Sequence, residues 1–226
     1  MDQIQTFDLI GFQGTGIISR TFAYLQKRML SKRSKNLEVV ITHVGLAIRG
    51  SDINNLPKNV ISILENRIDS TKVYIFESHI IPRRMDSVPD VFGSFPRGVK
   101  LRPLDEIVSN YNGRVFYSAH KFQTDQSMIS EFVDFIIQNN QRPYERSIQI
   151  LLSNVSRCFK TDQQTDSVFC SELVAKLLKK VKVLPEFVNP EKVVPLDFYC
   201  KPYDPTVGLD VDKEIPVLFH ERVSLK

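Results

Sequence analysis

Residues 169–174 read Phe169-Cys170-Ser171-Glu172-Leu173-Val174 and place a cysteine where an amphipathic helix is predicted to begin. The apolar side chains that follow recur every three or four residues, at Leu173, Val174, Leu177, Leu178 and Val181. Pro185 then ends the helical pattern. A thiol in the first turn of a helix lies against unpaired backbone N–H groups and the positive end of the helix dipole, which favour the thiolate. Because the thiolate is the nucleophilic form, this position indicates an activated cysteine.

A histidine suited to pair with this thiol lies on a predicted strand. Residues 39–48 are rich in β-branched and apolar side chains and contain His43. A histidine on such a strand is ordinarily a core residue, but Gly45, two positions later, leaves the same face of the strand uncrowded. A general base must come within hydrogen-bond distance of the group that it deprotonates. We therefore expect His43 to be the base if Cys170 is the nucleophile.

The composition is that of a soluble globular protein. The chain has 226 residues, of which 42% are hydrophobic and 25% are charged. We expect one domain over residues 1–226, with a C-terminal extension after about residue 200. The three cysteines, Cys158, Cys170 and Cys200, form no CxxC pair, which indicates a reducing compartment such as the cytoplasm. Cys158 and Cys200 are expected to be ordinary buried cysteines.

Several functional classes are not expected. The four histidines show no metal-ligand spacing with the cysteines, so neither a metal nor another cofactor is predicted. The net charge of +4 is mild, and no nucleic-acid-binding motif accompanies the basic residues 27–35, so no specific nucleic acid is expected. No secretory signal and no membrane span are predicted.

The order of strands and helices favours an α+β fold over a regular βαβ alternation. Strands are predicted at residues 7–12, 39–48, 60–64, 72–77, 98–104 and 115–118, and extended segments at residues 193–198 and 215–219. Helices are predicted after residue 16, at residues 105–111 and 127–137, and from Cys170, while residues 52–58 are expected to form a loop. Residues 82–96, rich in proline and charge, are expected to be a surface excursion that edges a site.

Six short blocks, taken in order, resemble a known family. They are Asp8-Leu9-Ile10, Ile17-Ile18-Ser19-Arg20, Thr42-His43-Val44-Gly45, Phe76-Glu77-Ser78, residues 98–104 and residues 169–174. Their order, with the cysteine last and at a helix start, is similar to that of the permuted papain-like cysteine hydrolases. These form the YiiX-like branch of the NlpC-type superfamily, which has poxvirus members and is related to the lecithin:retinol acyltransferase group. The match runs over roughly residues 8–198. It departs from the family at Phe7, where glycine is frequent, and in the polarity of residues 82–96.

The resemblance implies a circularly permuted papain-like fold, with an antiparallel sheet packed against the helix that carries the nucleophile. It implies Cys170 as the nucleophile, His43 as the general base and Glu77 as the residue that orients the imidazole. His79 competes with Glu77 for the third role, because strand alternation puts both side chains on one face. Glu77 is preferred, since a carboxylate also stabilises an imidazolium. One oxyanion donor would be the backbone N–H of Cys170, and the second is not identified by the sequence.

The sequence therefore predicts a cysteine-dependent hydrolase or acyltransferase that acts on an amide or ester through a thioacyl-enzyme. Two alternatives stay open. In the first, the chain is a papain-like module that serves as a structural or interaction component of a larger assembly, for example a virion. In the second, it transfers lipid acyl groups at a membrane surface, where the basic residues 27–35 contact anionic lipid. We favour a soluble amide or ester substrate, because no segment has the pattern of an interfacial anchor.

Overall fold

The computed structural model describes residues 1–16, 19–24, 40–64, 66–80, 88–93, 97–140, 142–143, 168–199, 218–220 and 222–226. They contain a six-stranded antiparallel sheet in the order β4-β3-β2-β1-β5-β6. The strands are β1 (Leu9–Gly14), β2 (His43–Arg49), β3 (Val73–Ile80), β4 (Arg97–Pro103), β5 (Gly113–Ser118) and β6 (Val223–Ser224). The helices are α2 (Gly50–Asn54), α3 (Lys58–Ile61), α4 (Leu104–Asn110), α5 (Gln126–Asn139) and α7 (Cys170–Lys180), with 3-10 turns η2 (Pro190–Lys192) and η3 (Pro195–Phe198). The α+β class is as predicted.

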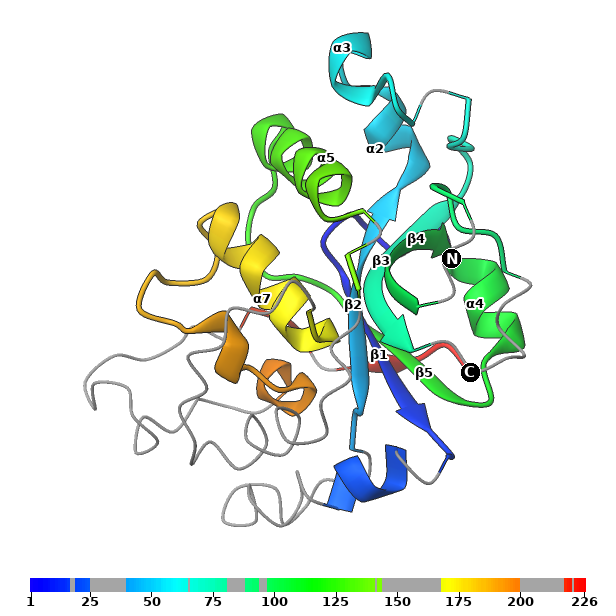
Figure 1. Cartoon of the computed structure of the whole chain (residues 1–226), viewed down its shortest axis with the longest axis vertical. Coiled ribbons are helices and arrows are strands. Elements are labelled where there is room, and N and C mark those ends of the chain that lie inside the picture. Colours follow the sequence, from blue (N-terminus) through cyan, green and yellow to red (C-terminus); the bar gives the residue numbers. More distant parts are fainter. Residues whose placement is uncertain are drawn as a thin grey trace.

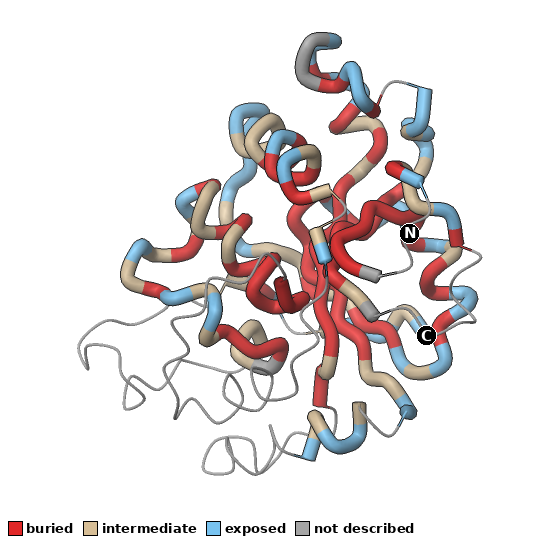
Figure 2. The backbone as a smooth tube through the Cα atoms, in the orientation of Figure 1, coloured by how far each residue is buried: buried red, intermediate tan, exposed pale blue. Residues whose placement is uncertain are grey.

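Helices cover both faces of the sheet (Figure 1). On one face, strand residues such as Leu46 and Phe76 pack against α5 and α7 in the larger hydrophobic cluster. On the other, Ile10 and Ile75 pack against α4 in a second cluster. Because successive strand residues point to opposite faces, strands covered on both sides are apolar at nearly every position. The central strands are accordingly buried along most of their length (Figure 2).

Helix α7 begins at Cys170 and packs across β2 and β3. Phe169, in extended conformation, is its N-cap residue, and the backbone N–H of Phe169 donates to Glu172 Oε2 at 3.3 Å. Lys179 and Lys180 occupy the last turn, where cations suit the negative end of the helix dipole. The apolar stripe that the sequence indicated is buried against the sheet. Cys170, the first residue of this helix, therefore lies in the hydrophobic cluster between the helix and these strands.

Most predicted elements are confirmed, with bounds shifted by a few residues. The predicted strands at residues 7–12, 39–48, 72–77, 98–104 and 115–118 correspond to β1 to β5. The predicted helices at residues 105–111 and 127–137 correspond to α4 and α5, and the Cys170 helix to α7. Residues 19–24 are helical, as expected after residue 16.

Three local predictions are wrong. Residues 60–64, predicted as a strand, begin inside α3 and continue as a turn; Pro57, whose fixed φ suits a helix start, precedes α3. Residues 52–58, predicted as a loop, begin inside α2, where Asp52 lies in the first turn. Residues 193–198, predicted as extended, contain η3, and Asp197 accepts a hydrogen bond from the backbone N–H of Val194 at 2.9 Å.

Several predictions concern residues outside those described. They include the basic residues 27–35, most of residues 82–96, Cys158, Cys200 and residues 215–217. Of the helices that the structure describes, none is long and apolar enough to cross a membrane.

Candidate active site

Cys170 is the first residue of α7, and the residue is 5% exposed. It is the free cysteine of the described chain segments. The side chain of Glu172 is held by Lys176, whose Nζ donates to Glu172 Oε1 at 2.5 Å, and by the backbone of Phe169. Glu172 thus stabilises the first turn of the helix that carries the thiol.

The partner of this thiol is His43, the first residue of β2. The charge of Cys170 acts on the His43 ring, and His43 Nε2 lies 2.5 Å from Glu77 Oε2. Because Nε2 of His43 is paired with Glu77, Nδ1 is the ring nitrogen that can interact with the Cys170 thiol. Burial alone would lower the pKa of His43, but the charge and hydrogen bond of Cys170, together with those of Glu77, raise it to about 9. The site therefore favours an imidazolium.

Glu77, on β3, is the carboxylate behind the imidazole and is 1% exposed. Burial would raise the pKa of this carboxyl, but the charge of Arg102 and the hydrogen bond from His43 lower it well below its usual value. Nη2 of Arg102 donates to Glu77 Oε1. Glu77 is thus an ionised acceptor with one oxygen toward His43 and the other toward Arg102.

His79 lies beside this pair but has a different environment. Its ring centroid is 4.5 Å from that of His43, with the rings edge to face. Burial and the charge of His43 lower the pKa of His79 to about 3, so the ring is neutral at physiological pH. Its Nδ1 is buried without a hydrogen-bond partner. The geometry puts Glu77, not His79, against Nε2 of His43.

The backbone around His43 depends on Gly45. A Cβ at this position would come within 2.8 Å of both the Ile75 side chain and the Phe76 carbonyl oxygen. The space that we expected a glycine to leave open is thus filled by β3. Phe12 packs on the other side, with its ring centroid 5.2 Å from that of His43. These contacts fix the imidazole where the thiol and the carboxylate can both reach it.

Arg102 is a site residue that the sequence reasoning did not single out, although it lies in a strand that was predicted. It faces Ile75 across the β3–β4 pair, while Glu77 faces Lys100, so the three polar side chains share one face of the sheet. The available signal was an arginine two positions after a lysine in an otherwise apolar strand. Sequence alone could not show that its partner is Glu77, because the two residues are 25 positions apart.

Asp8, which the resemblance placed in the first block, belongs to another cluster. Its Oδ1 lies 2.8 Å from His120 Nδ1 and accepts from the His120 backbone, while Oδ2 accepts from the backbone N–H of Gln5. Asp8 therefore links the N-terminal segment to the residues that follow β5.

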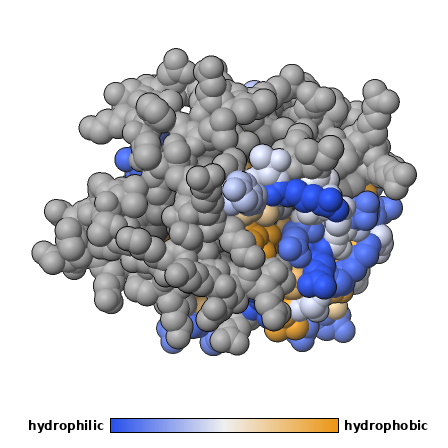
Figure 3. All heavy atoms as spheres, turned by 90° about the horizontal axis from the view of Figure 1, so that it is seen from below, coloured by the Kyte–Doolittle hydropathy of each residue, from blue (hydrophilic) through white to orange (hydrophobic). Residues whose placement is uncertain are grey.

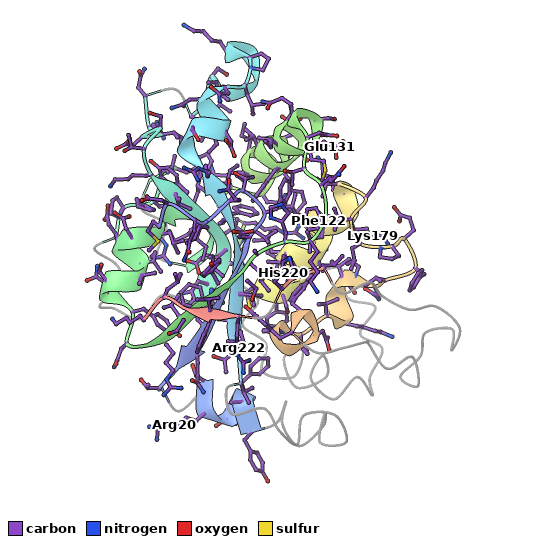
Figure 4. The ribbon with its side chains drawn as sticks, turned by 180° about the vertical axis from the view of Figure 1, so that it is seen from behind. Arg20, Phe122, Glu131, Lys179, His220 and Arg222 are labelled. Atoms are coloured by element: carbon purple, nitrogen blue, oxygen red, sulfur yellow. The ribbon has the colours of Figure 1, made fainter. Side chains whose placement is uncertain are left out.

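Figure 4 shows the described side chains, with Arg20 at the end of the molecule opposite α3.

Comparison with known proteins gives a structural likeness but no sequence relative. No family model matches the sequence, and no curated protein matches it. The crystal structure of metalloprotein yiiX from Escherichia coli O157:H7 is similar to the chain, with 15% sequence identity and a TM-score of 0.46. The similarity covers 99% of this chain and 97% of that one. Within the segments described, no group of three or more His, Cys, Asp or Glu side chains could hold a metal ion.

Proposed function

We propose that the chain is a cysteine-dependent hydrolase or acyltransferase with a permuted papain-like arrangement, acting on an amide or ester bond. The observation that supports this proposal is the line of buried groups from Cys170 through His43 to Glu77. A thiol at a helix N-terminus, a histidine base beside it and a carboxylate behind the base are the three parts of an activated nucleophile. The chain order of these residues, with the histidine before the cysteine, agrees with the permuted family.

The proposed reaction has two halves. In the first, the Cys170 thiolate attacks the carbonyl carbon, and the backbone N–H groups at the start of α7 stabilise the oxyanion. The His43 imidazolium then gives its proton to the leaving amine or alcohol, and a thioester forms. In the second half, neutral His43 takes a proton from water or another acceptor, which attacks the thioester and releases Cys170. Glu77 keeps the imidazole oriented throughout and stabilises its charged form.

The substrate is proposed to be a soluble amide or ester. The large hydrophobic side chains exposed among the described residues are separate in sequence: Met1, Tyr24, Ile63 and Val223. The described part of the face in Figure 3 mixes hydrophilic with hydrophobic residues. These features do not single out a lipid, so binding to liposomes with and without anionic lipid remains the test for a membrane substrate.

Trapping of an acyl-enzyme tests the proposal. The protein is incubated with a panel of activated esters and peptide amides, quenched in acid and examined by intact-mass and peptide-mapping mass spectrometry. We expect an acyl adduct on Cys170 with at least one substrate, and its loss in Cys170→Ala. Cys158→Ser and Cys200→Ser are matched controls that should keep the adduct. If no substrate in the panel is turned over, or if adducts form equally on the three cysteines, the result would favour the alternative in which the chain is a structural or interaction component.

A further inference from the structure

Arg102 is buried more completely than any other charged residue described, with no exposed surface. It lies on β4, and its Nη2 donates to Glu77 Oε1. Its other two nitrogens, Nε and Nη1, are buried and have no hydrogen-bond partner. A guanidinium with unpaired donors is unfavourable in a protein interior, because its lost hydration is only partly replaced. A purely structural role does not account for a buried, partly unpaired guanidinium. An apolar side chain would fill the same space with a smaller desolvation penalty.

The position of Arg102 gives it a direct influence on Glu77. A fully buried carboxyl tends to take up a proton, because burial disfavours its charge. Protonated Glu77 would donate to His43 Nε2 and leave the proton of the imidazole on Nδ1, which faces Cys170. In that state, His43 could not accept the thiol proton. The cation of Arg102 opposes this change because it favours ionised Glu77.

We propose that Arg102 is a positioning residue of the active site, acting through Glu77 to keep His43 as an imidazolium and Cys170 as a thiolate. This inference rests on the function proposed above. The four side chains then carry alternating charges, in the order Arg102, Glu77, His43, Cys170. Each charge is next to an opposite one, and the set is neutral as a whole. Arg102 itself does not touch the thiol or the substrate.

Lys100 supplies a matched control for Arg102. It lies two residues earlier on β4, points to the same face and is 3% exposed. Its Nζ pairs with Asp90 Oδ2 at 3.3 Å. Replacement of Lys100 therefore removes a buried cation from the same strand without removing the partner of Glu77. Lys100→Met and Arg102→Met each remove a buried cation from β4, but Arg102→Met also removes the partner of Glu77.

The experiment measures the rate of Cys170 alkylation by iodoacetamide from pH 4 to 10, with the modified peptide quantified by mass spectrometry. We expect wild type and Lys100→Met to react rapidly at pH 6. Arg102→Met should react at least about 10-fold more slowly at that pH. Loss of the opposite charge raises the pKa of the neighbouring Glu77 carboxyl, by about 1–3 units for such a pair, and this weakens the support of the imidazolium beside Cys170. Arg102→Lys, which keeps the cation, should lie closer to wild type. Circular dichroism checks that each variant is folded.

The outcomes separate this inference from the proposed function. Equal pH profiles for Arg102→Met and wild type would overturn the inference while leaving an activated Cys170 intact. A wild-type thiol that reacts only near pH 8.5, the ordinary value for cysteine, would contradict the proposed function itself. If Arg102→Met does not fold, Arg102→Gln replaces it, and the same loss of rate is expected because the charge is absent. An Arg102→Lys profile as displaced as that of the neutral variant would also count against the role of the cation.

Discussion

At the scale of single residues, the charged states of the site depend on a balance between burial, which disfavours charge, and neighbouring opposite charges, which favour it. Glu77, His43 and Arg102 are each buried, and burial alone would neutralise the first two. They keep their charges because each lies next to an opposite one, with Glu77 between the two cations. His79, on the same face, has no hydrogen-bond partner at Nδ1, and burial together with the charge of His43 keeps its ring neutral. The roles of Glu77 and His79 differ for this reason, although both are polar residues of the same strand.

The first prediction concerns these two residues. Glu77→Gln should lower kcat/KM by about 10²-fold or more, because the imidazolium loses its carboxylate and general acid–base catalysis contributes about 10²–10⁴-fold. His79→Ala should have a much smaller effect, since His79 makes no hydrogen bond to His43. The measurement is turnover of whichever ester or amide the trapping experiment identifies. The opposite ranking would transfer the orienting role to His79.

At the scale of secondary structure, periodicity predicted the elements that position the site. The apolar stripe after Cys170 specified α7, and the β-branched run around His43 specified β2, because both patterns are long enough to distinguish helix from strand. Residues 60–64 were misassigned because five apolar-rich residues fit either structure. Arg102 was in a correctly predicted strand, but its pairing depends on the β3–β4 register, which a single sequence does not specify.

The second prediction tests the close approach of β2 to β3. Gly45→Ala should destabilise the protein by about 1–3 kcal/mol, because the added methyl group meets the Phe76 carbonyl oxygen and the Ile75 side chain. Urea unfolding measures the change. Gly16→Ala is the control, since a Cβ there has no atom within 4 Å, and its effect should stay within about 0.5 kcal/mol. Equal stabilities for the two variants would show that the strand pair adapts to the methyl group.

At the scale of the whole molecule, the same buried groups link the site to stability. The pKa of His43 is raised from 6.5 to about 9, so its contribution to stability is complete below pH 6.5 and is lost as the pH rises through 9. The pKa of His79 is lowered from 6.5 to about 3, so stability falls as the pH drops below 6.5. Glu77, with a pKa lowered from 4.5, adds a further loss below pH 4.5. Stability should therefore be highest near pH 6.5.

The third prediction is that the thermal unfolding midpoint peaks near pH 6.5 and decreases on both sides. His43→Gln should flatten the decrease between pH 6.5 and 9, because the group that loses its proton there is gone. His79→Gln should flatten the decrease between pH 6.5 and 4.5. Differential scanning calorimetry across this range measures both slopes. A wild-type midpoint that rises steadily from pH 6.5 to 9 would contradict the charged state assigned to His43.

The central claim is that Cys170 is an activated nucleophile, and the most direct test is competitive labelling of the three cysteines. The folded protein is treated with limiting iodoacetamide at pH 6 to 7, and the adducts on Cys170, Cys158 and Cys200 are quantified by peptide mapping. We predict that Cys170 reacts far faster than the other two, because its thiol lies at a helix N-terminus and beside His43. Labelling of all three at similar rates, or of Cys170 only as the pH approaches 8.5, would contradict it.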